Sequence, residues 1–266
     1  MTEARMQETP ESAPGTFCWV ELGTTDGEAA KKFYTELFGW GFMDIPMGPG
    51  GVYTMLTQDG KEVGALYTMP SEMTSQGIPP NWLSYVLVES ADESAAAAKS
   101  LGGTLFKEPF DVMDVGRMAV IQDPTGAVFA IWQAGTHKGA GITGVPNSLC
   151  WNELTTSDVA RAGDFYTGLF GWGKNVQQMG DMTYTSFMNG ERPAGGMYEP
   201  PPAGVPPHWL AYFAVEDTDA MVKKANGLGA STVTPPMDIP DTGRFAILED
   251  PQGAAFAIIK LTDRPA

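Results

Sequence analysis

Residues 17–40 read FCWVELGTTDGEAAKKFYTELFGW, and residues 149–172 read LCWNELTTSDVARAGDFYTGLFGW. The two stretches align without a gap at a separation of 132 residues, and more than half of their positions are identical. A repeat of this quality predicts that the chain folds as two copies of one structural unit.

Two later stretches extend the repeat through the rest of the chain. NWLSYVLVES from Asn81 is matched by HWLAYFAVED from His208, and DPTGAVFAIW from Asp123 is matched by DPQGAAFAII from Asp250. The separation of these later matches is 127 residues, so the missing five residues fall in the loops of the second copy.

Local patterns predict the same order of elements in each copy. A strand at 17–23 precedes a helix that Asp26 caps, which runs to about Phe38 and ends at Gly39. Three strands follow, and the order returns after a loop at 70–80. The further elements are expected as strands near 40–46, 52–58, 62–68 and 82–89, a helix at 92–101, and strands near 104–107, 117–122 and 127–133.

The repeating unit is therefore βαβββ, four times over, which predicts an α+β fold of two tandem domains. We expect a loose tail at 1–15, a first domain at 16–134, a linker at 135–147 and a second domain at 148–262. The two halves resemble a dimer joined in one chain, so a monomer can hold both sites. The sequence leaves open whether a site combines units of one half or of both.

Composition narrows the class of partner. The chain has 266 residues, 43% of them apolar, and a net charge of −16 from 16 basic and 32 acidic side chains. This charge repels nucleic acid and anionic membranes. There is no long apolar run and no apolar segment typical of a signal peptide, which predicts a cytoplasmic protein without nucleic-acid or membrane partners.

The paired βαβββ units, the motif D-x-x-x-A-x-x-F-Y-x-x-L-F-G-W at 26–40 and 158–172, and the terminal D-P-x-G-x-x-F strands resemble the vicinal oxygen chelate superfamily. That superfamily includes glyoxalase I, extradiol dioxygenases and bleomycin-resistance proteins. The chain is also similar to the actinobacterial 27 kDa antigen group, which is often labelled glyoxalase-like or hydroxylase. The resemblance implies curved sheets around cup-shaped cavities.

Metal-dependent members of that superfamily hold a divalent ion inside the cup with His and Glu side chains at four strand positions. Mapped onto this sequence, three positions fall on Trp19, Leu83 and Ala130, and on Trp151, Leu210 and Ala257 in the second half. The strand at the fourth position, VGALY or AGGMY, has no carboxylate. With two histidines in the whole chain, we expect no metal and no other cofactor.

The same mapping places an aromatic lining with one carboxylate in each cup. Glu21 and Glu153 are the candidate acid or base groups, because burial would raise their pKa; the alternative is that they brace the structure. Aromatic side chains that could stack on a planar ligand, or simply pack the core, accompany them. The candidate ligand-binding residues are Trp19, Tyr53, Tyr85, Trp132, Trp151, Tyr184, His208 and Tyr212.

Further side chains are candidates for places in or near the same sites. Phe17 and Leu149 are expected in the cups, Trp82 and Trp209 are further stacking candidates, and Cys18 and Cys150 are expected to point toward the helices. Arg117 and Arg244 could clamp an anionic ligand or pair with Asp123 and Asp250. His137 in the linker is expected to be solvated.

Two functions from different classes remain. The first is a metal-independent protein that binds an apolar or aromatic small molecule, like the resistance proteins that sequester drugs. The alternative is an enzyme, either a glyoxalase-like lyase or isomerase or a hydroxylase-type oxygenase, which uses Glu-based proton transfer or an unorthodox metal site. A protein-interaction scaffold would follow if both cups were filled by their own side chains.

Overall fold

Each half of the chain forms its own eight-stranded mixed sheet. The computed structural model describes residues 13–48, 51–179, 182–198 and 205–262. The first sheet has the order β2-β3-β4-β1-β5-β8-β7-β6. Its strands are β1 (Phe17–Thr24), β2 (Gly41–Pro46), β3 (Val52–Gln58), β4 (Lys61–Thr68), β5 (Asn81–Leu87), β6 (Thr104–Val112), β7 (Gly116–Gln122) and β8 (Val128–Ala134).

The second sheet repeats this order as β10-β11-β12-β9-β13-β16-β15-β14. Its strands are β9 (Leu149–Thr155), β10 (Gly173–Met179), β11 (Met182–Asn189), β12 (Arg192–Tyr198), β13 (His208–Ala214), β14 (Ser231–Ile239), β15 (Gly243–Glu249) and β16 (Ala255–Leu261). The predicted α+β fold of four βαβββ units is confirmed. Each sheet takes all its strands from one half, which settles the pairing that the sequence left open.

The long helices start and end where their sequences predict. Asp26 accepts a hydrogen bond of 3.0 Å from the Ala29 amide at the start of α1 (Gly27–Phe38), and Gly39 ends the helix with φ 74°. Asp158 and Gly171 do the same for α4 (Val159–Phe170). The other helices are α3 (Ala91–Ser100), α5 (Thr218–Gly227) and the short α2 (Ser71–Ser75), which lies in the loop expected at 70–80.

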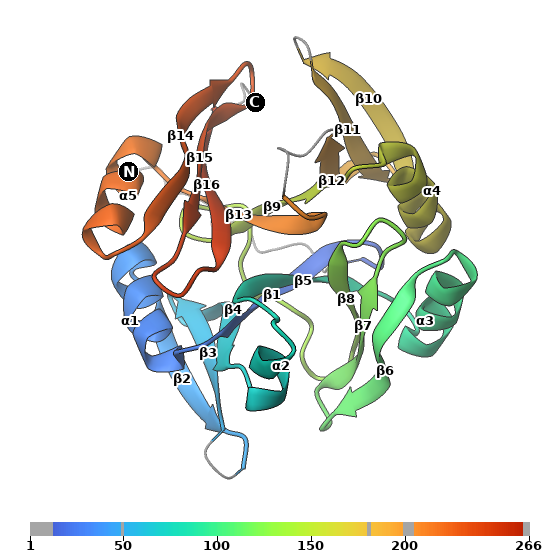
Figure 1. Ribbon diagram of the computed structural model, residues 1–266, viewed down its shortest axis with the longest axis horizontal. Helices are drawn as coiled ribbons and strands as arrows, with labels where there is room; N and C mark the ends of the chain where they lie inside the picture. The colour runs from blue at the N-terminus through green and yellow to red at the C-terminus, as the bar shows by residue number, and fades with distance from the viewer. Residues whose placement is uncertain (1–12, 49–50, 180–181, 199–204, 263–266) are drawn as a thin grey trace, which may run out of the picture.

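Helices α1 and α4 each pack against the sheet of the other half, whereas α3 and α5 pack against strands of their own sheets. Phe38 of α1 lies 5.3 Å from Phe213 of β13, and Phe129 of β8 lies 5.4 Å from Tyr166 of α4, measured between ring centroids. The convex faces of the two sheets thus share two buried cores. The concave faces open in opposite directions, with α1, α3, α4 and α5 along the sides (Figure 1). We call the concave face of the first sheet the first cup and that of the second sheet the second cup.

A β-bulge in β1 and another in β9 change which side chains face each cup. The pairing of β1 with β5 skips Cys18, and the pairing of β13 with β9 skips Cys150. The extra residue reverses the alternation before it. Phe17 therefore packs 4.9 Å from Trp209 in the shared core, and Leu149 lies in the other shared core. Both were expected in the cups, and that expectation is wrong.

The bulges also correct the orientation expected for the cysteines. Cys18 packs with Trp19 and Tyr85 on the cup side, and Cys150 packs beside Tyr212. Burial raises the pKa of each thiol to about 12, so both are small apolar side chains rather than nucleophiles.

The start of the chain is only partly described. Residues 1–12 of the expected loose tail lie outside the described residues. Gly15, however, is fixed: its amide donates to the Leu87 carbonyl at 2.7 Å and its carbonyl accepts from the Trp172 indole at 2.8 Å. Among the described residues, no helix has the length and apolar character needed to cross a bilayer.

Candidate functional site

The centre of the second cup is a carboxylate held by two tyrosines. Glu153 of β9 accepts hydrogen bonds from Tyr184 of β11 at 2.9 Å and from Tyr212 of β13 at 2.6 Å, one on each carboxylate oxygen. The Trp151 indole donates to the Tyr184 hydroxyl at 3.0 Å. Three strands of one sheet therefore fix the carboxylate, which is the arrangement expected of residues that share one face.

The first cup repeats this arrangement with the same residue types. Glu21 of β1 accepts a hydrogen bond of 3.1 Å from Tyr85 of β5 and another from Tyr53 of β3. Tyr53 in turn accepts from the Trp19 indole. Strand alternation thus brings together Glu21, Trp19, Tyr53 and Tyr85, and in the other half Glu153, Trp151, Tyr184 and Tyr212.

Burial dominates the acid–base properties of both carboxyls. It raises the pKa of Glu21 and of Glu153, although the tyrosine hydrogen bonds work in the opposite direction. Burial and the neighbouring carboxylate also raise the pKa of Tyr85 and Tyr212 well above the usual value. The tyrosines therefore remain protonated hydrogen-bond donors near neutral pH.

Next to each site lies one half-buried tyrosine that the sequence analysis did not single out. Tyr198 lies directly opposite Tyr184 across the β11–β12 pair and accepts a hydrogen bond of 3.1 Å from Thr155. Tyr67 holds the matching position in the first cup, where its hydroxyl lies 3.9 Å from the Met73 sulfur of α2. The helix α2 thus covers part of the mouth of the first cup (Figure 1). The repeated pattern G-x-x-Y at 64–67 and 195–198 could have revealed both.

The residues at the superfamily's metal positions do not fit a metal. Trp19, Leu83 and Ala130 lie together in the first cup, and Ala65 stands beside Glu21 where the fourth donor would be. In the second cup Gly196 stands beside Glu153. Indole, alkyl and glycine positions supply no lone pair of adequate strength. Across 13–48, 51–179, 182–198 and 205–262, no three His, Cys, Asp or Glu side chains gather as a metal site would require.

The remaining candidate ligand-binding residues divide between cup, rim and core. Trp132 of β8 is 5% exposed and lies in the first cup with Trp19. His208 is half-buried at the start of β13, with its Nδ1 atom 2.9 Å from the Pro206 carbonyl. Trp82 and Trp209 lie in the shared cores, where their indoles donate to Tyr34 and Tyr166, so they are not stacking surfaces.

The two arginines are structural and bind different partners from those expected. Arg117 binds Asp92 of α3 through two hydrogen bonds of 2.8 and 2.9 Å and also binds Asp111. In the second half, Arg244 makes the equivalent contacts with Asp219 of α5 and Asp238 of β14. Neither pairs with the aspartate of the D-P-x-G turn, and neither is directed at a cup.

Asp123 and Asp250, which were the expected arginine partners, instead serve the contact between the halves. The Asp123 carboxylate accepts hydrogen bonds from the amides of its own turn and from the Tyr166 hydroxyl at 2.9 Å. Asp250 does the same with Tyr34. Each turn is thereby anchored to a helix of the other half.

His137 is a partly buried residue of the first cup, contrary to the expectation that it is solvated. Its ring lies 4.7 Å from the Trp19 ring and 5.9 Å from the Trp132 ring. Its Nδ1 atom lies 3.2 Å from a carboxylate oxygen of Glu62. Sequence alone could not reveal this contact, because linker position and glycine neighbours say nothing about where the linker folds back.

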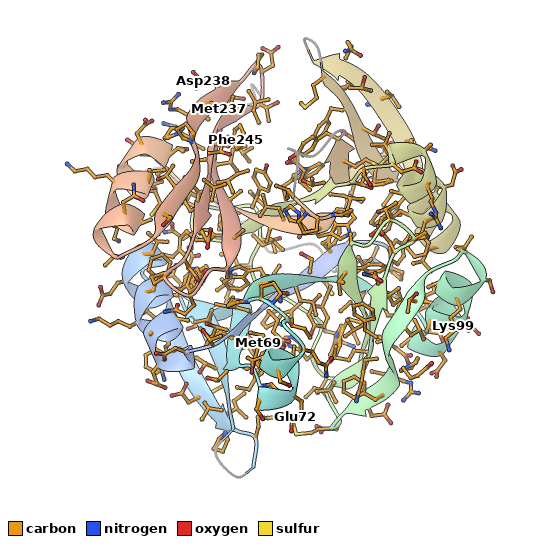
Figure 2. The ribbon with its side chains drawn as sticks, in the orientation of Figure 1. Met69, Glu72, Lys99, Met237, Asp238 and Phe245 are labelled. Carbon is orange, nitrogen blue, oxygen red and sulfur yellow. The ribbon has the colours of Figure 1, made fainter. Side chains whose placement is uncertain are left out.

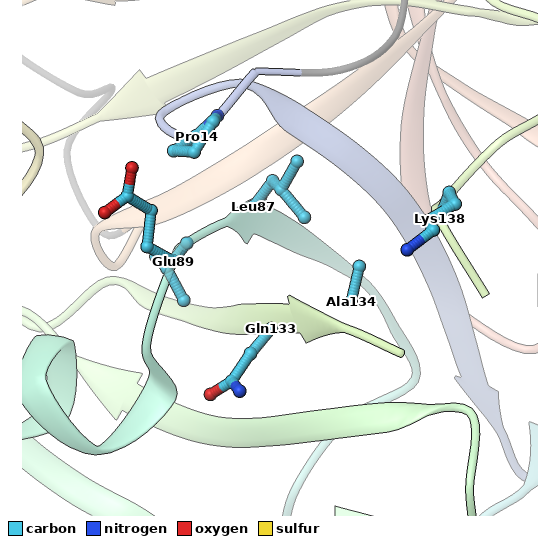
Figure 3. Close-up of a pocket in the computed structure, with 7 residues that line it drawn as sticks. Pro14, Leu87, Glu89, Gln133, Ala134 and Lys138 are labelled. Atoms are coloured by element: carbon cyan, nitrogen blue, oxygen red, sulfur yellow. The ribbon is translucent and has the colours of Figure 1, made fainter. Parts of the chain in front are cut away.

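A cavity of about 290 Å³ lies at the end of the first cup, between the N-terminal segment and the linker (Figure 3). It is lined by residues that include Pro14, Leu87, Glu89, Gln133, Ala134 and Lys138. The charged side chains of Glu89 and Lys138 are both exposed, so the cavity offers a ligand no desolvated charge. Glu21 and Glu153, inside the cups, remain the better candidates for chemistry.

The comparisons with known proteins agree with this geometry. The sequence model of the Glyoxalase/Bleomycin resistance protein/Dioxygenase superfamily matches residues 148–258, and that of the bleomycin resistance protein-like N-terminal region matches residues 16–57. CFP32 of Mycobacterium tuberculosis, provisionally named a glyoxylase, is 43% identical over 96% of this chain and 98% of its own. The anthracycline biosynthesis protein DnrV of Streptomyces peucetius is 38% identical over 94% of this chain and 95% of its own.

Solved structures share the fold at low sequence identity. The Mn(II)-bound glyoxalase from Novosphingobium aromaticivorans superposes with a TM-score of 0.65 at 16% identity, covering 93% of this chain and 82% of that one. The 2,3-dioxygenase LapB from Pseudomonas sp. KL28 superposes with a TM-score of 0.66 at 14% identity. The match covers 96% of this chain and 95% of LapB. With its duplicated sheets and close sequence relatives, the chain belongs to the glyoxalase/bleomycin resistance protein/dioxygenase superfamily, the vicinal oxygen chelate fold.

Proposed function

We propose that this protein binds a planar, apolar small molecule in its second cup without a metal. The observation that carries the proposal is the setting of Glu153, a half-buried glutamate among half-buried aromatic side chains. Trp151, Tyr184 and Tyr198 are all half-buried there, whereas Trp19 in the first cup is 4% exposed. Aromatic faces with a few fixed polar groups are typical of small-molecule sites.

The opposite wall of the second cup supports the same proposal. Phe245 of β15 and Met237 of β14 pair directly across the sheet, and Figure 2 labels both. Phe245 packs with Tyr212 at 6.3 Å between ring centroids, while Met237 is 49% exposed. A flexible thioether beside aromatic rings adapts to ligands of different outline.

The polar groups define what the ligand presents to the protein. Both oxygens of Glu153 accept hydrogen bonds from tyrosines, and burial raises the pKa of the carboxyl, so this carboxyl and the tyrosine hydroxyls are the polar partners that the cup offers a ligand. A fused aromatic ring system with a carbonyl or hydroxyl edge fits this description. The relatives DnrV and DauV are named for the biosynthesis of anthracyclines, which are molecules of that class.

The test is calorimetric titration of the intact protein with doxorubicin, an anthracycline. We expect saturable binding that W151A weakens at least tenfold and that the matched first-cup variant W19A leaves unchanged. Equal losses in both variants, or a loss in W19A alone, would place the ligand elsewhere. Absence of binding to the folded protein would exclude anthracyclines, and with them this proposal in its present form.

The metal-free part of the proposal has its own measurement. Equilibrium dialysis against Mn²⁺, Ni²⁺, Fe²⁺ and Zn²⁺, followed by elemental analysis, should leave much less than one ion per chain, and doxorubicin affinity should not change with a chelator. One tightly held ion per chain would show that the cup has donors other than those mapped here.

A second candidate function is glyoxalase-like isomerisation, because Glu153 combines a raised pKa with a short contact to Tyr212. The carboxylate would take a proton from the carbon beside a carbonyl and return it to the neighbouring carbon, with a tyrosine stabilising the oxygen that gains charge. Incubation with the hemithioacetal of methylglyoxal and glutathione tests this. Activity that survives in E21Q/E153Q would exclude Glu-based proton transfer.

A further inference from the structure

The linker places an imidazole against the aromatic floor of the first cup. The His137 ring meets the Trp19 ring edge to face, at 4.7 Å and 87°, and meets the Trp132 ring at 5.9 Å and 71°. Both tryptophans are nearly inaccessible, at 4% and 5% exposure. This is the contact that a planar heteroaromatic ligand would make with the same two residues.

Specific polar contacts hold the imidazole in place. Glu62 of β4 lies 3.2 Å from His137 Nδ1, and the Trp132 indole donates to the His137 carbonyl at 3.0 Å. The side chain of His137 is 18% exposed, so the contact with Glu62 is partly shielded from water. The first contact fixes the ring and the second fixes the backbone that carries it.

The next residues of the linker form backbone hydrogen bonds with strands β1 and β4. The Ala140 amide donates to the Cys18 carbonyl and the Gly141 amide donates to the Glu62 carbonyl, both at 2.8 Å. Gly139 has φ 106°, and a side chain there would collide with the Cys18 carbonyl. A glycine at 139 therefore lets the linker lie close to the bulge in β1, which brings His137 over Trp19.

The second half lacks the carboxylate that anchors the imidazole. Strand pairing places Glu62 opposite Thr57 and places Pro193 opposite Met188, so Pro193 occupies the position of Glu62. Trp151, the counterpart of Trp19, is half-buried instead of buried. The two cups thus share the Glu–Tyr–Trp centre and differ in what covers the tryptophan.

We propose that His137 is a built-in occupant of the first cup, so that one chain binds one ligand, in the second cup. This inference rests on the proposed function for the second cup and adds the reason why the first cup does not bind. The imidazole supplies the ring contact that a ligand would otherwise make, and Glu62 is the positioning residue that holds it there.

The test is the binding stoichiometry for doxorubicin in calorimetric titrations. The wild type should bind one molecule, H137A should bind two, and H137A/W151A should return to one. E62Q, which frees the imidazole without removing it, should show a weaker second site. The matched control K138A, at the exposed neighbouring residue, should bind one. Two sites in the wild type, or one site in a folded H137A protein, would overturn the inference while leaving the proposed function intact.

A measurement without ligand separates this inference from the proposed function. Acrylamide should quench a larger fraction of tryptophan emission in H137A than in the wild type, and H137A/W19F should show a smaller increase, because Trp19 is one of the two tryptophans that the imidazole contacts. K138A should match the wild type. An unchanged quenching profile in H137A would show that the imidazole does not cover Trp19, whatever the titrations give.

Discussion

Tyr34, on α1 of the first half, donates a hydrogen bond of 2.9 Å to Asp250, in a turn of the second half. The same hydroxyl accepts from the Trp82 indole at 3.0 Å. Tyr166, on α4 of the second half, likewise donates to Asp123 of the first half at 2.9 Å and accepts from the Trp209 indole at 2.7 Å. One buried hydroxyl thus serves as donor and acceptor at each of two equivalent contacts between the halves.

Replacing either tyrosine by phenylalanine should destabilise the whole molecule. Y34F leaves the Trp82 N–H and one oxygen of Asp250 without partners in a buried site, which costs roughly 2–5 kcal/mol. Urea unfolding followed by tryptophan fluorescence and by circular dichroism checks this. We expect one cooperative transition at lower urea, and a similar shift for Y166F.

Y67F is the control for these variants, since Tyr67 lies in the first cup and away from the shared cores. Its midpoint should stay close to that of the wild type. Two separate transitions in Y34F would contradict the account, because they would show that each half is stable without its contact to the other.

The buried glutamates should make stability depend on pH with a definite sign. Burial raises the folded-state pKa of Glu21 and Glu153 above the ordinary value of 4.5. The stabilising contribution of the protonated carboxyl is complete below pH 4.5 and is lost as the pH rises through the folded-state pKa. The free energy of unfolding of E21Q/E153Q, relative to wild type, should therefore increase from pH 4 toward pH 8.

The prediction concerns how the difference in free energy of unfolding between E21Q/E153Q and the wild type changes with pH, not the size of that difference at one pH. Glutamine also changes the tyrosine hydrogen bonds, but this contribution is constant with pH. A difference that decreases with rising pH would mean that the tyrosine donors outweigh burial and that the carboxyls are lowered in pKa.

Gly196 allows the second cup to form its hydrogen-bond chain. The Tyr184 hydroxyl lies directly over it, and an added Cβ would overlap that oxygen. G196A should displace Tyr184 from Glu153 and Trp151, change the tryptophan emission and weaken doxorubicin binding. The first cup has Ala65 at the same pairing position, so A65G is the matched control and should leave the affinity unchanged. Unaltered binding by G196A would remove Tyr184 from the site.

The arginine contacts should matter for stability but not for binding. R117M removes the contacts of Arg117 with Asp92 on α3 and Asp111 on β6, so its melting temperature should fall slightly in dilute buffer. The difference should shrink in 1 M NaCl, because exposed ion pairs are screened. R244M is the counterpart in the second half. A loss of doxorubicin affinity in either variant would restore the ligand role considered for these arginines.

The sequence was sufficient for the architecture because repetition and capping are local signals. Asp26, Gly39 and their counterparts mark the helix ends directly, and strand alternation brought Glu153, Tyr184 and Tyr212 to one face. The failures have physical causes of their own. A single extra residue reversed Phe17 and Cys18, since a bulge leaves no mark in composition.

Contacts between distant segments were equally invisible to local patterns. The local sequence around Asp123 would be the same whether its carboxylate bound an arginine or a tyrosine of the other half. Its partner is determined by how the two halves pack together. His137 belongs to the same class, because its place depends on the path of a linker.

The back-to-back arrangement of the sheets has an evolutionary consequence. The residues that hold the halves together lie on the convex faces and the helices, whereas Glu21, Glu153 and their neighbours lie on the far sides. A substitution inside one cup therefore leaves the common foundation, and the opposite cup, untouched. After the duplication, each cup was free to acquire, change or lose a specificity on its own, while every change to the foundation had to suit both copies.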